Sequence, residues 1–192
     1  METALSSLSL LEYRIRAVAI GHLALRYSMT WDEVPSMTDY FDDVQVMEGS
    51  ATGFTNGAIE SAVIHCRALL EFMGLGAGAT ATTLRELTSS RRREDDDGVE
   101  FIDGLNRVTI AEAVASYAGE EQEAQAALAF VAHIANKGLA HMSRSFSKHD
   151  AGARLLEIAF RGVPILVCNK VYVRLGLEPP QYKPQGRKRA GT

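Results

Sequence analysis

The segment of residues 58–73 constrains the fold more than any other part of the chain. Its apolar side chains recur at intervals of three and four residues, a spacing that places them on one face of an α-helix. Arg67 and Glu71 share the opposite face at a spacing of i, i+4, where an ion pair adds to helix stability. The segment therefore predicts an amphipathic helix packed against a core. Its apolar face consists of Ile59, Ala62, Val63, Cys66, Leu69, Leu70 and Met73.

Three further segments show helical periodicity, over residues 9–27, 120–147 and 151–175. Shorter helices are expected to begin at Thr30 and Thr109, because Thr-x-x-Glu at each position is a capping-box sequence. Ala, Leu and Glu are plentiful, and only 5 of the 192 residues are proline. This balance favours helix over sheet. The sequence thus predicts an all-α fold, a four- to five-helix bundle with short extra helices.

The last of these segments is apolar on almost every side. Such a helix is either central in a bundle or shared with a second subunit, so the pattern predicts a homodimer built partly on it. Pro164 should kink this helix, since proline removes a backbone donor. The β-branched residues between positions 163 and 173 leave a strand as an alternative.

Length and composition predict one helical domain over residues 1–177, followed by a disordered basic tail over residues 178–192. A chain of 192 residues fits a single domain with its own core. The tail contains three prolines and the basic run Arg187-Lys188-Arg189, a composition that buries little apolar surface.

Several classes of protein are disfavoured. Cys66 and Cys168 form no CxxC pair and lie in apolar surroundings, which indicates buried thiols without a disulfide partner in a reducing compartment. No export signal is visible, and the nearly uncharged segment 162–169 is far shorter than the ~20 apolar residues of a membrane span. A cytoplasmic protein with no membrane partner is therefore expected. No nucleotide-binding glycine motif or metal-ligand spacing occurs, so no cofactor and no metal are expected.

The segment of residues 132–144 bears most directly on function. At 100° per residue, Lys137, His141, Arg144 and Lys148 fall on a common face, opposite the apolar stripe of the same predicted helix. Such a row can bind phosphates although the net charge is −4, and the neighbouring cations favour neutral histidine. Neutral His141 could then act as general base toward a ribose 2′-hydroxyl, the step that starts metal-independent RNA cleavage. The alternative is a solvated helix face that carries a histidine by chance.

Two short stretches resemble the HEPN superfamily. One is Asn136-Lys137-x-x-x-His141, late in a long helix, and the other is His65-Cys66-Arg67-Ala68-Leu69-Leu70-Glu71-Phe72, a helix end followed by an acid-rich loop. The resemblance covers about residues 58–175. It implies a four- to five-helix bundle, often dimeric, of the kind found in toxins, abortive-infection proteins and RNA-processing nucleases.

The resemblance also implies roles for individual residues. Active members of the superfamily carry Arg-x(4–6)-His, usually with a polar residue directly after the arginine. His141 matches the catalytic histidine and Asn136 resembles the polar residue, but no arginine stands at Ala135 or its neighbours. The motif is therefore degenerate. Substrate would contact Asn136, Lys137, Arg144 and Lys148.

Three functions stay open on the sequence alone. The first is a HEPN-like domain that binds RNA, as a metal-independent ribonuclease or a toxin- or defence-type protein with a degenerate active site. The second is a non-enzymatic helical module for dimerisation or partner binding. A bundle that binds a small molecule is a third alternative, based only on an Ala- and Met-rich core. Whether the chain is an enzyme is not decided by these patterns.

Overall fold

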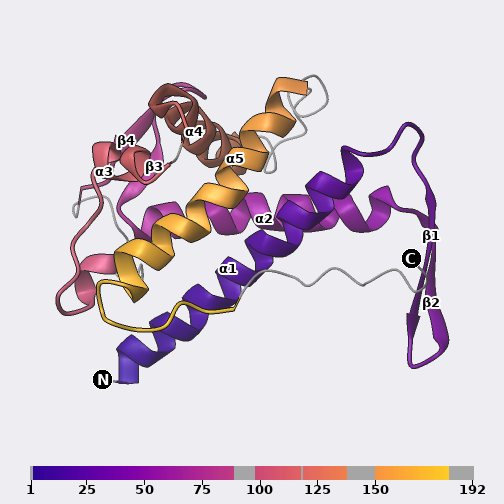
Figure 1. Ribbon diagram of the computed structural model, residues 1–192, viewed down its shortest axis with the longest axis horizontal. Coiled ribbons are helices and arrows are strands. Elements are labelled where there is room, and N and C mark those ends of the chain that lie inside the picture. The colour runs from indigo at the N-terminus through magenta and orange to yellow at the C-terminus, as the bar shows by residue number, and fades with distance from the viewer. Residues whose placement is uncertain (1, 89–97, 118, 138–149, 182–192) are drawn as a thin grey trace.

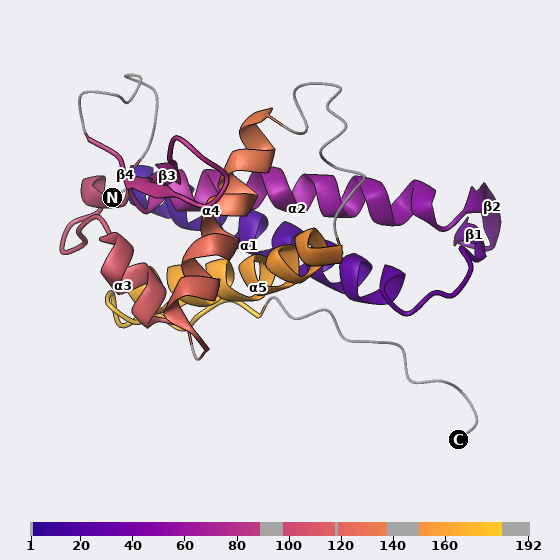
Figure 2. The ribbon, with the colours of Figure 1, turned by 90° about the horizontal axis from the view of Figure 1, so that it is seen from above.

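The computed structural model describes residues 2–88, 98–117, 119–137 and 150–181 (Figure 1). Its body consists of four helices: α1 (Glu2–Ser28), α2 (Thr52–Phe72), α4 (Glu121–Lys137) and α5 (Asp150–Val167). α1 packs along both α2 and α5, and α4 packs on α2 and α5 from the other side. Figure 2 shows α4 running across the other three helices. None of the described helices is long and apolar enough to cross a membrane.

The core lies between these four helices. The whole apolar face predicted for residues 58–73 is buried, which confirms that prediction. Each of the other helices adds fully buried side chains to the same cluster, among them Ile15 and Val18 from α1, Val131 from α4 and Phe160 from α5. Burial of these apolar surfaces is the main stabilising contribution to such a fold.

α1 and α2 approach each other closely at Gly21. A Cβ atom at this position would lie 2.2 Å from the Cβ of Ala62 and 2.6 Å from the backbone oxygen of Ala58. Both distances are far inside van der Waals contact, so only glycine allows the two helices to cross at this separation.

The prediction of an all-α fold is wrong, because the described residues include two antiparallel β-hairpins and the fold is mixed. The first pairs β1 (Ser36–Phe41) with β2 (Val44–Ser50) and extends beyond the ends of α1 and α2 in Figure 1. The sequence predicts a helix start at Thr30, but its hydroxyl instead donates to the Tyr27 carbonyl at the end of α1. Asp42 and Asp43 connect the strands with φ of 48° and 65°. Positive φ at both central residues defines a type I′ turn.

The second hairpin follows α2 directly. Gly74, at φ of +91°, ends the helix, and β3 (Leu75–Ala77) pairs with β4 (Leu84–Glu86). The sequence predicts only a linker here, because strands of three residues are too short to show alternation. Both strands contact α4.

The 3-10 turn η2 (Val99–Phe101) and the short α3 (Ile110–Ala115) follow. α3 begins with the predicted capping box, in which the Thr109 hydroxyl accepts from the Glu112 N–H.

The last helix is α-helical to Val167 and continues as a π-helical turn, η3 (Cys168–Tyr172). Residues 163–173 are therefore helical, and the strand alternative is excluded. Pro164 lies inside α5. Most apolar side chains of this segment are buried within the same chain, and Ile165, at 38% exposure, is the large apolar residue that α5 leaves at the surface. This burial removes the feature of the last helix on which the sequence-based homodimer depended.

Candidate functional site

The basic row of residues 137–148 falls largely outside the described part of the chain. Asn136 is half-buried in the last turn of α4, and Lys137 is the last residue of that helix. His141, Arg144 and Lys148 lie outside the described residues, as does the expected continuation of the helix to residue 147. The structure thus places Asn136 and Lys137 at one end of α4.

Two histidines join α1 to its neighbouring helices. His65 Nδ1 on α2 lies 3.2 Å from Arg14 Nη1, and its ring meets the Tyr13 ring edge-on at 5.3 Å. Burial lowers the pKa of His65, and the Arg14 charge lowers it further. His22 Nε2 lies 3.2 Å from Glu157 Oε1 on α5. Burial lowers the pKa of His22, and the charges of Arg26 and Arg161 add to this effect, so the net shift is downward although the Glu157 carboxylate opposes it. Both imidazoles therefore favour the neutral form and serve as helix-to-helix contacts.

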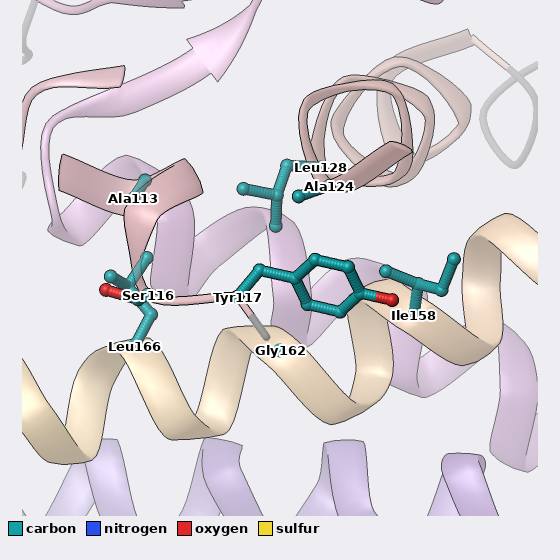
Figure 3. Close-up of a pocket in the computed structure, with 8 residues that line it drawn as sticks. All are labelled: Ala113, Ser116, Tyr117, Ala124, Leu128, Ile158, Gly162 and Leu166. Carbon is teal, nitrogen blue, oxygen red and sulfur yellow. The ribbon is translucent and has the colours of Figure 1, made fainter. Parts of the chain in front are cut away.

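An apolar crevice lies between the end of α3 and α5 (Figure 3). The Tyr117 ring extends across it, between Leu128 of α4 and Ile158 of α5. Arg161 holds this ring from α5: its Nη2 donates to the Tyr117 hydroxyl at 3.2 Å, and its guanidinium carbon lies 5.8 Å from the ring centroid. The empty volume, counted to the open mouth, is about 310 Å³. This volume includes open solvent, and the enclosed space of about 20 Å³ holds about one water molecule, so the crevice resembles a packing defect around Tyr117.

A polar hollow of about 410 Å³, counted in the same way, lies where residues 104–108 meet η3. Two of its cations are engaged in ion pairs. Lys170 Nζ lies 2.9 Å from Glu112 Oε1, and Arg107 binds the Glu100 carboxylate and donates to the Leu87 carbonyl. These bonds join the loop to the surrounding elements, so Arg107 and Lys170 have structural partners within the chain.

Metal and thiol chemistry find little support in the described ranges. No group of three His, Cys, Asp or Glu side chains among those residues is placed to hold a metal ion. Cys66 and Cys168 are buried and unpaired with each other, and burial raises the pKa of both thiols. Protonated, buried thiols are poor nucleophiles.

The outward side of α1 carries a stripe that the described residues leave largely exposed and that we term the α1 stripe: Tyr13, Arg16, Ile20, Leu23 and Tyr27. Its four apolar members are between 47% and 60% exposed. The Arg16 side chain is 56% exposed and pairs with Glu12 one turn earlier. The spacing of three and four residues is the a/d pattern of a coiled-coil seam, on the side of α1 opposite the buried Val18.

The α1 stripe is also self-complementary. Ile20 and Leu23 lie at equal distances from the midpoint between residues 21 and 22, and so do Arg16 and Tyr27. A second α1 helix that ran antiparallel about this midpoint would set Ile20 against Leu23 twice. It would also set Arg16 against the Tyr27 ring twice. An interface in which a surface meets itself about a two-fold axis has this symmetry.

The sequence-based interpretation missed the α1 stripe, because α1 carries two apolar stripes and the buried one accounts for its amphipathicity. The heptad spacing from Tyr13 to Tyr27 is visible in the sequence and could have identified the second stripe.

No model of a known protein family, no curated protein and no solved structure matches this chain significantly. The resemblance to the HEPN superfamily therefore remains a prediction from short motifs, and function is argued from the surfaces of the chain.

Proposed function

We propose that this chain is a non-enzymatic helical module that forms a homodimer through the α1 stripe. The observation that supports the proposal is the exposed, self-complementary heptad seam of α1. Apolar side chains gathered on one exposed helix face mark an interaction site, whereas scattered ones do not. α5 is not used, because its apolar side chains are largely buried.

The α1 stripe alone favours a weak dimer. Fully burying a large apolar side chain contributes about 1.5–3 kcal/mol, so the half-exposed Ile20, Leu23 and Tyr27 of two copies contribute roughly 5–9 kcal/mol. Two contacts between Arg16 and Tyr27 add about 1 kcal/mol each. Association costs at least ~4 kcal/mol. The surplus of about 3–7 kcal/mol corresponds to a Kd on the order of 10 µM to 10 mM.

Light scattering across this concentration range tests the proposal. The average mass should rise from 20.9 kDa toward twice that value as concentration increases. Leu23→Glu should hold the protein at the monomer mass, because it places two carboxylates in the central layers of the seam. Phe101→Lys is the control: Phe101 is 72% exposed on η2, outside the α1 stripe, and its substitution should leave association unchanged. A wild-type chain whose average mass shows no rise at all up to ~1 mM would contradict this function.

We propose RNA binding, with or without cleavage, as the second candidate function. It is supported by the basic row of Lys137, His141, Arg144 and Lys148 and by the HEPN-like spacing of Asn136 and His141. A ribonuclease of this type would cut RNA without metal, with His141 as the general base.

The RNA proposal is tested by incubating the protein with single-stranded RNA in the presence of a chelator. His141→Ala should lower the cleavage rate by about 10²–10⁴-fold. Lys137→Ala should weaken RNA binding and reduce its salt dependence, as the loss of a phosphate contact does. Arg26→Ala, which removes an exposed cation from α1, is the control. If the wild-type chain neither cuts nor binds RNA, this candidate is excluded and self-association is unaffected.

A further inference from the structure

The β1–β2 ribbon has one apolar face and one polar face. Side chains alternate between the two faces of a strand, and paired residues of neighbouring strands share a face. The pairs Asp39↔Met47 and Phe41↔Val44, together with Met37, define the first face. Val44 and Met47 share this face because the register shifts between Asp39 and Tyr40, which leaves Val46 as an extra residue in β2. The opposite face carries the pairs Ser36↔Ser50, Thr38↔Glu48 and Tyr40↔Gln45.

The apolar face has little cover from the described part of the chain. Phe41 is 68% exposed, Val44 64% and Met47 40%, and Met37 is half-buried. Among the described residues, the main contact of the ribbon with the helical body is near its base, where β2 contacts α2. An antiparallel sheet usually packs one face on a core, and a lone two-stranded hairpin is marginally stable in water. A second element that covers this face would therefore stabilise the ribbon.

The acidic charge of the ribbon indicates which kind of element could cover its apolar face. Residues 29–51 contain no Lys, Arg or His. They contain six acidic side chains, Asp32, Glu33, Asp39, Asp42, Asp43 and Glu48. Two ribbons packed face to face would bring two such sets together, and like charges set against each other cost several kcal/mol. A second copy of this chain is therefore a poor occupant, and a basic partner is complementary.

We propose that the apolar face of the β1–β2 ribbon binds a basic amphipathic helix of a partner protein. Helices are the elements that most often cover one face of a small antiparallel sheet. Strands of six and seven residues span about 20 Å, which matches about 13 residues of helix. The apolar side of the helix lies on Phe41, Val44 and Met47. Lysines or arginines along its margins reach Asp39, which lies on this face, and Asp42 and Asp43 of the turn. This site is separate from the α1 stripe and does not depend on the dimer.

Fluorescence anisotropy with a labelled leucine–lysine peptide of amphipathic helical spacing tests this site. The peptide should bind saturably, and the same peptide with glutamate in place of lysine should not. The double variant Phe41→Ser/Val44→Thr should weaken binding about tenfold or more, since tenfold corresponds to 1.4 kcal/mol and two apolar contacts are lost. Tyr40→Thr is the matched control, because Tyr40 is 56% exposed on the opposite face of the same strand.

A charge variant separates the acidic contribution from the apolar one. Asp42→Asn/Asp43→Asn removes two charges while keeping the turn, because asparagine tolerates positive φ. It should weaken peptide binding at low salt and leave binding at high salt nearly unchanged.

Three results would overturn the proposal. The first is equal peptide affinity in the wild-type chain and in Phe41→Ser/Val44→Thr. The second is binding that appears only after residues 182–192 are removed, which would identify the chain's own basic tail as the occupant. The third is a lower average mass for Phe41→Ser/Val44→Thr than for the wild-type chain at the same concentration in light scattering. That result would identify a second copy of the chain as the occupant. Leu23→Glu should bind the peptide as the wild-type chain does, so failure of the dimer leaves this test intact.

Discussion

The Glu112 carboxylate joins α3 and its cap residue Thr109 to η3. It accepts from the backbone N–H and the hydroxyl of Thr109, which closes the capping box of α3, and from Lys170 Nζ of η3. The hydrogen bond from Lys170, followed by that from the Thr109 backbone, lowers the pKa of Glu112 to about 2. The stability that this group contributes is therefore fully present above its ordinary value of 4.5 and is lost as the pH falls toward 2.

Glu112→Gln should make the free energy of unfolding less dependent on pH in the acid range. The free energy of unfolding of the wild-type chain should fall more steeply between pH 4.5 and pH 2 than that of the variant. The difference should be at most about 1 kcal/mol, because the carboxylate is 43% exposed and its ion pair is screened by solvent. Urea unfolding at several pH values measures both slopes. Parallel slopes would show that the bond from Lys170 does not persist in solution.

His22 and His65 should make the stability of the fold depend on pH in a higher range than Glu112 does. Burial lowers the pKa of both imidazoles below 6.5, so the unfolded chain takes up protons more readily than the folded one. Stability should be greatest above pH 6.5 and should fall as the pH drops below that value. His22→Gln/His65→Gln should weaken this dependence between pH 7 and pH 5, measured by thermal unfolding. A wild-type chain that gains stability over the same drop in pH would contradict the burial of both rings.

The close contact between α1 and α2 can be tested by comparing the same glycine-to-alanine substitution at a crowded and at an open helix position. Gly21→Ala raises helix propensity by ~1 kcal/mol, but its Cβ would overlap Ala62. We expect a net loss of about 1–3 kcal/mol in the free energy of unfolding. Gly162→Ala on α5 is the matched variant, because a Cβ there meets no atom within 4 Å. It should stabilise the chain by up to ~1 kcal/mol. Chemical denaturation of the two variants checks both signs, and equal effects would contradict the close helix crossing.

The elements also show what the sequence could and could not predict. The helix over residues 58–73 was predictable, since its apolar face repeats over four turns. Thr109 was predictable as a helix start, whereas the same Thr-x-x-Glu spacing at Thr30 was not informative. No apolar helical repeat follows Thr30, and Pro35 interrupts the stretch before β1. A capping-box sequence therefore predicts a helix only when an amphipathic segment follows it.

The candidate site was less predictable than the helices. Residues of the β1–β2 ribbon alternate over only six positions, and the apolar side faces solvent, so its pattern does not match a half-buried strand. The α1 stripe was obscured by the stronger buried stripe around Val18. The basic row around His141 was conspicuous in the sequence, but its main members lie outside the described residues.

For the whole molecule, the α1 stripe and the β1–β2 ribbon follow each other along the chain and differ in charge and symmetry. The α1 stripe contains Arg16 and complements itself, which favours a second copy of the chain. The ribbon contains only acidic charges and complements a basic partner. We therefore propose that the chain dimerises through the α1 stripe and binds another protein through the β1–β2 ribbon.

Disulfide trapping tests the antiparallel α1 pairing most directly. Ile20→Cys and Leu23→Cys chains should cross-link when mixed under mild oxidation, because the pairing sets position 20 against position 23. Cys66 and Cys168 should not interfere, since both are buried and burial raises the pKa of their thiols. We expect a disulfide between one Ile20→Cys chain and one Leu23→Cys chain to form much faster than a disulfide between two chains of the same variant. Same-variant disulfides that form as fast as the mixed one, or no cross-link at any concentration up to ~1 mM, would contradict it.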